Sequence, residues 1–588
     1  MKIKIVSLLV IIFLISNACK TNVASTSDEK PNIENQELKK IPIVQKLREN
    51  AHLPILGQIA LYYQMKTNEF DTYNFENEDE LTMYAYSFLW ENKIPEAIEL
   101  FKLIVAEFPN SSNAYDSLGE GYFKNNEMEL SLVNFEKSLA LNPDNFNAED
   151  YIEHIKFPTK KQIQPLEKFH SVYSVEDYRA DLDQLGTTLL KVHPNALKFI
   201  SKADFWKAIE EKKALINDKT TFATFSWHCS EIIANVNCSH TNMGSFGFEG
   251  MMLPIELRFP VQTRLIANKL YLINPLNNAD KLQAKHEIEA INGVSISEII
   301  KDCFKHIPSQ GYIETTKIHF FNKWNAAMIP YSLGFPSHFE LKIKGIEKTI
   351  KLDTAVKISE PFYDASLDFP EEKLALKFIE KGQIAYLSIT SFNYYRWNDF
   401  EVFKTFIDNS FNEIRKRKVK KLIIDVRNNP GGSQSASIHL LQYLVKEPFT
   451  YYSTVLSPGK KDKSEGEEST IPHKNTYKGK SYFLIDGVGN STTGHFMSIV
   501  KHLKLGTIIG EELGSNQFCS AGMTTCRLKF TKLEYYVANN THESLATSLP
   551  DEVGILPDYF VTQQIDDYFK KIDTVKEFTI KLVKKEGK

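Results

Sequence analysis

Lys421–Gly432 reads KLIIDVRNNPGG, and Tyr482–His495, further along the chain, reads YFLIDGVGNSTTGH. Each begins with β-branched and apolar residues and breaks into a Gly- and Asn-containing turn, which predicts a buried strand that delivers a polar loop to one edge of a sheet. The first loop ends in Pro430-Gly431-Gly432, whose backbone amides can approach a ligand closely because no side chain intervenes. The second places a small nucleophile, Ser491, in a strand-to-helix turn. One loop can donate hydrogen bonds while the other attacks, so the two together predict a serine hydrolase.

The segments around these two loops alternate between strand and helix patterns. The pattern predicts an α/β layer structure for a catalytic core at residues 376–565. Its expected strands and helices are Gln383–Ser391, Phe400–Lys416, Lys421–Arg427, Ser435–Val445, Ser481–Asp486, Thr493–Lys504 and Thr507–Gly510, in chain order. A helix is expected at residues 566–588.

Length and charge bound the possibilities. A chain of 588 residues is too long for one core, so three or four domains are expected. A formal net charge of -4 gives no electrostatic case for binding nucleic acid. The cysteines show no metal-ligand spacing, and no cofactor is expected. Cys519 and Cys526 flank a Gly-containing turn, so a hairpin disulfide is one interpretation and buried thiols are the other.

The amino terminus has the pattern of a targeting segment, residues 1–19. Lys2 and Lys4 precede the apolar run Ile5–Ile15, and small residues then lead to Cys19. Cys19 resembles the lipidated cysteine of bacterial lipoproteins, which implies membrane attachment at this residue; plain secretion is the alternative. Either way the protein is expected to be exported, as a periplasmic or outer-membrane lipoprotein under the first interpretation. Residues 20–45 are expected to form a flexible tether.

Residues 46–160 are expected to be helical, with an internal repeat at about residues 78–144. Phe101 and Phe135 are 34 residues apart, as are Pro109 and Pro143. This period resembles the tetratricopeptide repeat, which implies helix pairs. Such repeats commonly bind a protein partner, and a helical spacer is the alternative.

Two further segments precede the core. Residues 170–250 carry helical periodicity at Val175–His193, Lys202–Asn217 and Phe222–Val236, and the last helix ends in Ser239-His240. Residues 251–355 are expected to form a small β module, with strands at Leu257–Val261, Leu265–Leu272 and Phe339–Leu352. Within it, Glu287–Ile300 has a strand–turn–helix pattern that resembles part of a PDZ domain, a fold that binds peptides by strand addition. A small barrel is the alternative.

The core resembles the tail-specific, C-terminal-processing serine protease family. The similarity rests on Asp425-x-Arg427-Asn428-x-x-Gly431-Gly432, on Gly489-Asn490-Ser491-Thr492-Thr493, on Thr507–Glu511 and on Gly554-Ile555-Leu556-Pro557-Asp558, in the family's order. It extends over about residues 170–565 and implies multidomain architecture: helical repeats, then an α/β (α+β) protease core with an inserted PDZ-like domain. The better-known branch pairs its serine with a lysine 25 residues later, where this chain has Asn516.

The other branch, which includes tricorn protease, uses a Ser/His/Ser/Glu arrangement. Its resemblance implies that Ser491 is the nucleophile, His240 the base, and Ser239 the link to a carboxylate, for which Glu552 is preferred over Asp551. The implied oxyanion donors are the amides of Gly431 or Gly432 and of Thr492. His495 is a competing base, and the Asp425–Arg427 pair is expected to rigidify its turn.

The expected function is therefore an exported serine endopeptidase that cleaves exposed or unfolded polypeptide. A catalytically inactive peptide- or ligand-binding lipoprotein with a protease fold is the alternative, motivated by the missing lysine. An esterase would share the chemistry.

Overall fold

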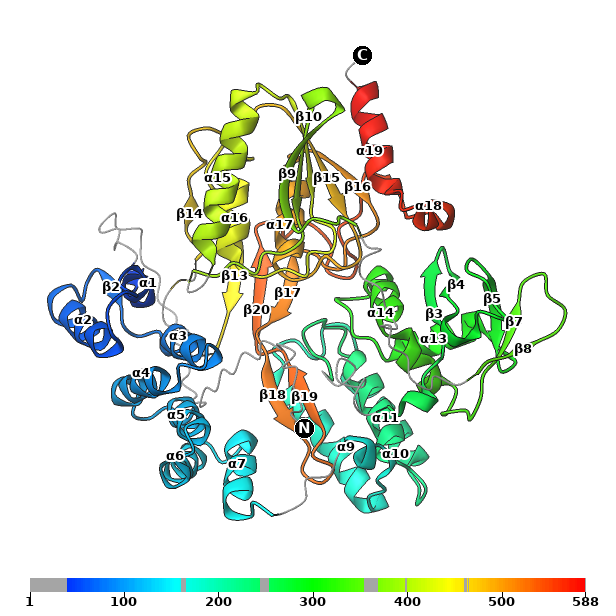
Figure 1. Ribbon diagram of the computed structural model, residues 1–588, viewed down its shortest axis with the longest axis horizontal. Coiled ribbons are helices and arrows are strands. Elements are labelled where there is room, and N and C mark those ends of the chain that lie inside the picture. The colour runs from blue at the N-terminus through cyan, green and yellow to red at the C-terminus, as the bar shows by residue number, and fades with distance from the viewer. Residues whose placement is uncertain are drawn as a thin grey trace. The chain divides into compact units, whose positions relative to one another are not determined.

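The computed structural model describes residues 40–159, 165–243, 253–353, 369–396, 399–458, 463 and 465–586. The chain divides into two compact units (Figure 1): one comprises the chain up to Gln162 with Tyr395–Glu401, and the other comprises Ile163–Tyr394 and Val402–Lys588. The expected targeting segment, including Cys19, lies outside the described residues.

The first unit is built from helices that recur at a fixed interval. Helices α3, α5 and α7 begin at residues 78, 112 and 146, and α4 and α6 begin at residues 94 and 128, an interval of 34 residues in each case. Gly119 of α5 lets these helices approach closely, since a Cβ there would lie 3.0 Å from the Phe135 ring of α6. The elements are β1 (Ile41–Pro42), α1 (Ile43–Glu49), α2 (Ile55–Asn68), β2 (Tyr73–Asn74), α3 (Glu78–Trp90), α4 (Ile94–Glu107), α5 (Ser112–Lys124), α6 (Met128–Leu141) and α7 (Phe146–Lys156).

The start of this unit differs from the sequence-based expectation. Residues 41–45, which were assigned to a tether, belong to β1 and to the start of α1. The reason is that Val44 and Leu47 have fully buried side chains in the core of the unit. Burial of these apolar side chains stabilises the helix, although the sequence just before it is polar.

The second unit is organised around a six-stranded sheet. The strand order is β21-β16-β15-β11-β10-β9, with all neighbours parallel except β9, which runs antiparallel to β10. The strands are β9 (Leu374–Ile379), β10 (Ile384–Ile389), β11 (Lys421–Asp425), β15 (Lys480–Ile485), β16 (Thr507–Gly510) and β21 (Tyr559–Phe560). The polar loops after β11 and β15 therefore emerge at the same edge of adjacent parallel strands.

Both faces of this sheet are covered, as the unbroken apolar runs require. Leu422 and Ile424 of β11 pack on the face that carries α15 (Phe400–Lys416), α16 (Gln434–Gln442) and α17 (Thr492–His502). Ile423 packs on the opposite face, with α19 (Thr574–Lys585). Figure 1 shows α15 and α16 on one side of the sheet and α19 on the other. The predicted α/β core is thus present. The single helix predicted at residues 566–588 is instead two, α18 (Ile565–Phe569) and α19.

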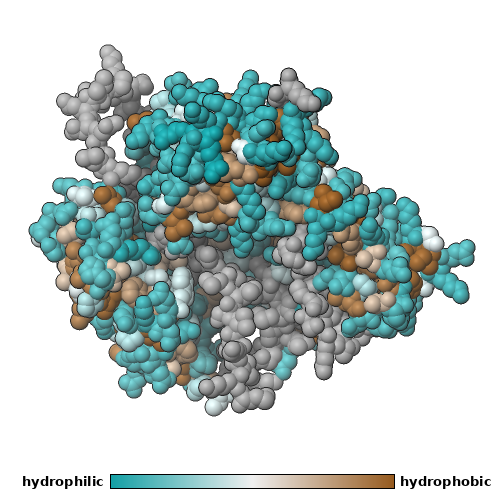
Figure 2. Space-filling view, turned by 45° about the horizontal axis from the view of Figure 1, so that its top comes forward, coloured by the Kyte–Doolittle hydropathy of each residue, from teal (hydrophilic) through white to brown (hydrophobic). Residues whose placement is uncertain are grey.

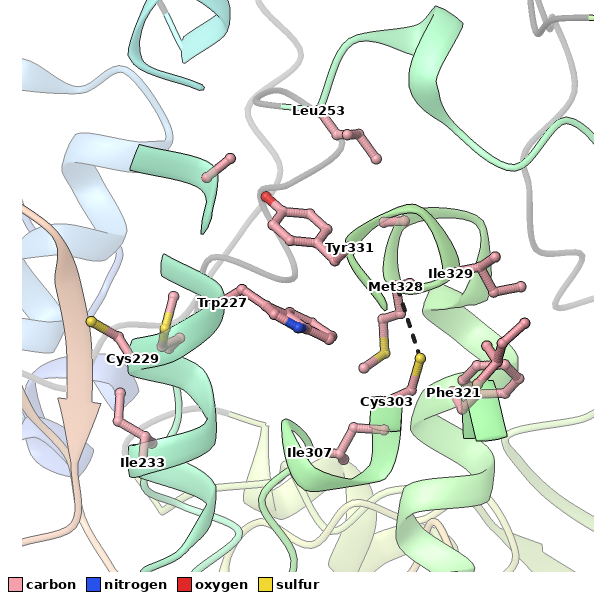
Figure 3. Packing of buried hydrophobic residues seen from close by; sticks show 14 of the residues in the cluster. Trp227, Cys229, Ile233, Leu253, Cys303, Ile307, Phe321, Met328, Ile329 and Tyr331 are labelled. Atoms are coloured by element: carbon pink, nitrogen blue, oxygen red, sulfur yellow. Dashed lines mark hydrogen bonds between the residues drawn. The ribbon is translucent and has the colours of Figure 1, made fainter. Parts of the chain in front are cut away.

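Among the described residues from 165 to 243, four helices share a hydrophobic core with the β module. They are α8 (Pro165–His170), α9 (Val175–Val192), α10 (Lys202–Leu215) and α11 (Phe222–Ala234). In Figure 3, Trp227 of α11 faces Met328 and Tyr331, and its ring stacks on Tyr331 with 5.2 Å between centroids. Trp227 also stacks on His306, at 3.5 Å. The helical segment and the β module are therefore packed together.

The β module contains the largest departures from the predicted elements. Leu257–Val261 is not a strand, because a 3-10 turn occupies Ile255–Leu257. The predicted strand Leu265–Leu272 is a hairpin, and Phe339–Leu352 is two short strands. A helix of 19 residues, α14, was not predicted. The elements are β3 (Gln262–Ile266), β4 (Lys269–Asn274), β5 (Glu287–Ile291), β6 (Val294–Ser295), α13 (Ile296–Lys305), α14 (Glu314–Ser332), β7 (Glu340–Ile343) and β8 (Ile350–Lys351).

Helix α14 closes the outer edge of β3. The Asn322 side chain accepts from the Leu265 N–H at 2.6 Å and donates to the Leu265 carbonyl at 3.1 Å. Asn325 donates to the Thr263 carbonyl at 3.1 Å. Side-chain amides thus take the positions that a neighbouring strand's backbone would otherwise fill.

The remaining strands form smaller sheets beside the core. They are β12 (Phe449–Thr450) with β14 (Ser469–Thr470), the three-stranded sheet β13 (Tyr452–Leu456), β20 (Asn540–Ser544) and β17 (Phe518–Ala521), and the hairpin β18 (Thr524–Arg527) and β19 (Glu534–Val537). Cys519 and Cys526 both carry free thiols, so the hairpin disulfide is absent.

On the face drawn in Figure 2, hydrophilic side chains predominate and apolar ones gather in separate groups. Among the helices of the described residues, none combines the length and apolar character needed to cross a membrane.

Candidate active site

Ser491 occupies a strained turn between β15 and α17. Its backbone has φ 54° and ψ -123°, a conformation that side-chain-bearing residues rarely adopt. It holds the N-cap position of α17 without making a side-chain cap hydrogen bond, while its N–H donates to Asn490 Oδ1 at 2.8 Å. Strain of this kind concentrates at functional sites, where surrounding contacts enforce it. The hydroxyl is therefore not used to cap its own helix.

The two glycine-containing loops meet at Ser491, as the sequence predicts. A Cβ on Gly431, where φ is +101°, would lie 2.7 Å from the Asn490 carbonyl oxygen and 2.8 Å from Ser491 Cβ. The Thr492 hydroxyl donates to the Gly432 carbonyl at 2.5 Å and ties the loops together. Only glycine at position 431 permits this approach.

Two backbone amides near Ser491 remain available. The Gly431 N–H already donates to Asn429 Oδ1 at 3.0 Å. The N–H groups of Gly432 and Thr492, by contrast, have no hydrogen-bond acceptor in the described part of the chain. Of the two glycines suggested by the sequence, Gly432 is thus the one with a free donor. Together with Thr492 it can stabilise a developing oxyanion.

The loop that carries His240 is fixed by contacts to distant strands. Asn242 and Tyr536 of β19 exchange two backbone hydrogen bonds, of 3.0 and 2.8 Å. The Thr241 hydroxyl accepts from the Ala538 N–H at 3.0 Å. Burial of the imidazole lowers the pKa of His240 to about 4, so the ring is neutral near pH 7. A neutral imidazole is the form that can accept a proton.

Cys519 of β17 contacts both His240 and Ser491. Its sulfur is 3.7 Å from His240 Nδ1, and its thiol also interacts with the Ser491 hydroxyl. Burial raises the pKa of this thiol, which keeps it protonated. No direct hydrogen bond between His240 and Ser491 is present within the described ranges. No sequence motif predicts this position of Cys519, because the pairing of β17 with β20 brings it here.

Ser239 contacts Asn490 rather than a carboxylate. Its hydroxyl donates to Asn490 Oδ1 at 3.0 Å, and its oxygen lies 3.3 Å from His240 Nδ1. The Glu552 side chain is exposed, and only its carbonyl oxygen is held, by the Tyr312 N–H at 2.8 Å. The structure therefore does not bring Glu552 to Ser239. The order of the motifs predicted which segment carries Glu552, but it could not predict the direction in which the Glu552 side chain points.

Two other positions considered for the site make structural contacts instead. They are Asp551, the alternative carboxylate, and Asn516, which stands where the better-known branch has its lysine. Asp551 pairs with Lys198 at 2.6 Å and accepts a hydrogen bond from Gln517. Asn516 donates its side-chain amide to the carbonyls of Asp551, at 2.6 Å, and Val553, at 3.0 Å. Asn516 thus fastens the segment that carries Asp551 and Glu552 and offers no amine for catalysis.

The competing base, His495, is packed away from solvent. Its side chain is 2% exposed and its ring packs edge-on against Tyr452, with 5.3 Å between centroids. Burial is the main cause that lowers the pKa of His495 to about 3, and the neighbouring His542 adds to it. A residue so enclosed contributes to packing.

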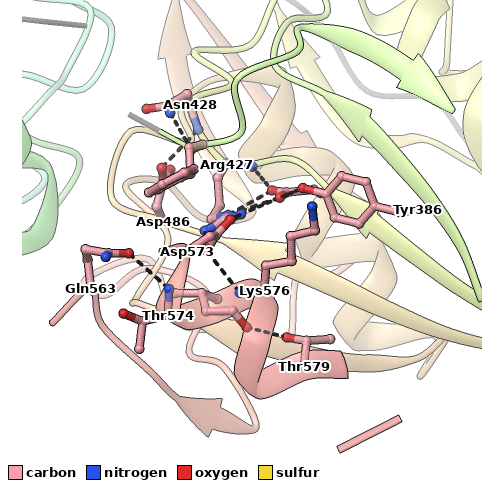
Figure 4. Close-up of polar contacts among 12 residues, drawn as sticks. Tyr386, Arg427, Asn428, Asp486, Gln563, Asp573, Thr574, Lys576 and Thr579 are labelled. Atoms are coloured by element: carbon pink, nitrogen blue, oxygen red, sulfur yellow. Dashed lines mark hydrogen bonds and ion pairs between the residues drawn. The ribbon is translucent and has the colours of Figure 1, made fainter. Parts of the chain in front are cut away.

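The turn after β11 is held by a buried ion network (Figure 4). Arg427 forms hydrogen bonds with Asp425 at 2.6–3.2 Å and with Asp573 at 2.6 and 2.8 Å. Tyr386 adds a 2.5 Å hydrogen bond to Asp425. Burial alone would raise the pKa of Asp573, but the Arg427 guanidinium lowers it below its ordinary value. The Asp425–Arg427 pair is therefore structural, as the sequence indicates.

Part of the core matches a known protein family. Residues 383–561 match the family model of peptidase family S41, which supports an S41 peptidase core there. The carboxy-terminal processing protease CtpB of Bacillus subtilis is 25% identical over 150 residues, 24% of this chain and 28% of CtpB. The match thus spans less than a third of that relative's length.

Solved structures also match parts of this chain, at low identity. Mature CPAF is 13% identical with a TM-score of 0.48, covering 70% of this chain and 99% of CPAF. Tricorn protease is 14% identical with a TM-score of 0.32, covering 70% of this chain and 37% of tricorn protease.

Proposed function

We propose that the protein is an exported serine-type endopeptidase that cleaves exposed or unfolded polypeptide, with Ser491 as nucleophile and His240 as base. The observation that carries the proposal is the convergence of the strained Ser491 turn, the free amides of Gly432 and Thr492, and the Ser239-His240 loop. The S41 match to the core supports peptide-bond chemistry.

The hydrogen bonds around His240 support one tautomer. Asn490 Oδ1 can only accept, so the Ser239 hydroxyl must donate to it. The Ser239 oxygen is then left to accept from His240 Nδ1–H. This leaves Nε2 of the neutral imidazole without a proton and able to act as a base.

Peptide cleavage follows from these roles. Ser491 Oγ attacks the scissile carbonyl carbon while its proton passes to the unprotonated nitrogen of His240, which requires the two side chains to come into direct contact. The amides of Gly432 and Thr492 hold the oxyanion. His240 then returns the proton to the leaving amine as the C–N bond breaks. A water molecule hydrolyses the acyl-enzyme by the same route and restores Ser491.

The flanking regions extend this proposal. Lipidation of Cys19 would attach the protein to a membrane, supported by the basic and apolar residues before it. The 34-residue interval of α3 to α7 supports a tetratricopeptide array that binds a protein partner. The sheet and helices of the β module support a PDZ-like fold.

Proteolysis of an unfolded test protein by the full-length chain tests the proposal, with the fragments read by mass spectrometry. The matched variant is Ser491→Ala, which removes the nucleophile and keeps the fold. Cleavage by the parent alone is the expected result. Inert behaviour from both proteins, with the fold intact, would overturn the proposal in favour of a binding protein.

A further inference from the structure

Asn429 lies in the loop between β11 and α16, two residues before Gly431. Its side chain is fully buried, and the reaction derived above gives it no role. A buried side-chain amide is costly unless its donor and its acceptor are both hydrogen-bonded. The hydrogen bonds of Asn429 therefore indicate what it does in this loop.

Asn429 is bonded to its own loop and to the ends of two other strands. Its side-chain Nδ2 donates to the Ile389 carbonyl at 3.0 Å, and Oδ1 accepts from the Gly431 N–H at 3.0 Å. Its backbone carbonyl accepts from the Asn490 N–H at 3.3 Å. Ile389 ends β10 and Asn490 follows β15, the two strands that flank β11 in the sheet. One residue thus joins the ends of three adjacent parallel strands.

The residues on both sides of Gly432 are held by hydrogen bonds. The Gly431 N–H donates to Asn429, and the Gly431 carbonyl accepts from the Phe392 N–H at 3.0 Å. The Ser433 N–H donates to the Phe392 carbonyl at 2.7 Å. Of the three consecutive amides at 431–433, only that of Gly432 has no acceptor within the described ranges of the chain. The loop therefore uses two of these donors internally and leaves one available.

Contact with the segment after β10 fixes the place of Gly432. A Cβ at Gly432, where φ is +137°, would lie 2.3 Å from the Phe392 carbonyl carbon, so the loop lies directly against this segment. Asn429 holds the same segment three residues earlier, at the Ile389 carbonyl. Without the Asn429 side chain the loop would lose this anchor, and the Gly431 N–H would become a second donor that competes with Gly432.

We propose that Asn429 is a positioning residue that makes Gly432 the oxyanion donor of its loop. It occupies the Gly431 N–H and anchors the loop to the ends of β10 and β15, which leaves the Gly432 N–H to stabilise the oxyanion formed at Ser491. The inference rests on the proposed peptidase function and concerns the same site. Asn429 acts through the loop and does not touch the substrate. A neutral amide suits this role because it supplies a donor and an acceptor without placing a charge beside the oxyanion.

Kinetics of Asn429→Ala in the full-length chain test the inference. The substrate is a peptide that spans a cut site of the parent. The probe is the peptide aldehyde that ends at that cut, because its adduct with Ser491 places an oxygen at the oxyanion position. The variant should lose about 10²-fold in kcat with KM within about twofold, since the oxyanion contact is made in the transition state. The inhibition constant of the aldehyde should rise by a similar factor, a change that general loosening of the fold would not produce at an unchanged KM.

Two further variants sharpen the test. Asn429→Ser keeps an acceptor that can reach the N–H two residues on, as serine does in turns, but is too short to donate to Ile389, so it should lose less than the alanine variant. Asn278→Ala is the matched control in the β module. Asn278 is also fully buried, accepts from the Asp353 N–H at 2.7 Å and donates to the Asp353 carbonyl at 3.4 Å. Its loss should leave kcat and the affinity for the aldehyde unchanged.

The outcomes distinguish this inference from the proposed function. Parental kinetics in a folded Asn429→Ala, or a lower kcat without weaker aldehyde binding, overturns the inference and leaves the peptidase intact. Failure of both Asn429 variants to fold, followed by circular dichroism, would assign Asn429 to stability alone and would also overturn it. Absence of cleavage by the parent overturns the peptidase and this inference with it.

Discussion

The Ser239 hydroxyl donates a hydrogen bond of 3.0 Å to the side-chain oxygen of Asn490. The residue before the base is thereby bonded to the residue before the nucleophile. The same oxygen accepts from the Ser491 N–H at 2.8 Å. Asn490 thus orients both halves of the candidate catalytic pair without carrying a charge.

Asn490→Ala should lower kcat/KM by about 10²-fold, because both hydrogen bonds that align Ser239 and Ser491 are lost. Asn490→Asp keeps an acceptor at this position and should retain more activity than the alanine variant. Steady-state kinetics on one peptide measures both. Equal losses in the two variants would show that the acceptor oxygen is not what matters.

The pH profile of kcat/KM should reflect the neutral imidazole of His240. Because burial lowers its pKa to about 4, activity should be level from about pH 5 upward and should fall as pH drops through 4. Asn490→Asp places a negative charge near the ring, stabilises the imidazolium and should move this fall to higher pH. Circular dichroism at each pH controls for unfolding. A fall centred near pH 6.5 in the parent would contradict the buried state of His240.

Stability should also depend on pH through buried neutral histidines. The folded pKa of His495 is about 3, below its ordinary 6.5, so the unfolded chain binds a proton that the folded chain does not. Its contribution to the free energy of unfolding is complete above pH 6.5 and is lost as pH falls towards 3. His495→Phe should therefore lessen the loss of stability between pH 7 and pH 4, by at most about 3 kcal/mol. Urea unfolding at both pH values measures it, and an unchanged difference would count against the assignment.

Gly431→Ala should abolish most activity. Its new Cβ would press on the Asn490 carbonyl and Ser491 Cβ, and displacing the nucleophile should cost about 10²–10³-fold in kcat. Gly345→Ala is the matched control, because Gly345 also has a positive φ, +79°, but nothing lies within 4 Å of its Cβ position. Similar kinetics for the two variants would mean that backbone strain, rather than contact with Ser491, sets the effect.

Arg427→Met should lower the free energy of unfolding by about 3–5 kcal/mol, because Asp425 and Asp573 would remain buried without their partner. The exposed Arg417, which pairs with Glu413 at 3.4 Å, supplies the control. Arg417→Met should cost less than about 1 kcal/mol. Urea denaturation compares them, and equal costs would refute the structural role of the buried network.

The core was predictable because its strands are continuous apolar runs that end in turn residues. The meeting of the Gly431 and Ser491 loops followed from parallel strands sharing an edge. The hairpin between β3 and β4 was hidden, since Ala267 and Asn268 adopt positive φ of 49° and 60° without a glycine to mark the turn. Helix α14 was hidden because it has apolar residues on several sides and a proline, Pro330, within it.

The side chains of the site were less predictable than its loops. Motif order placed Ser491 and the Ser239-His240 pair in one sequence framework but could not give the direction of Glu552. Asn490 lies within a motif that assigned it no role, Cys519 lies in none, and the contacts of both depend on segments far apart in the chain. Such contacts depend on side-chain rotamers and on strand register, and neither can be predicted from the spacing of residues in a motif.

The asparagines of α14 oppose the binding of any peptide that would add a strand beside β3 in the β module. Such a peptide must first displace the hydrogen bonds that Asn322 and Asn325 make to Leu265 and Thr263. Each is worth about 0.5–1.5 kcal/mol, so the gain from new backbone hydrogen bonds is largely cancelled. Strand addition at this edge is therefore an exchange rather than a net gain, and only side-chain contacts can favour it.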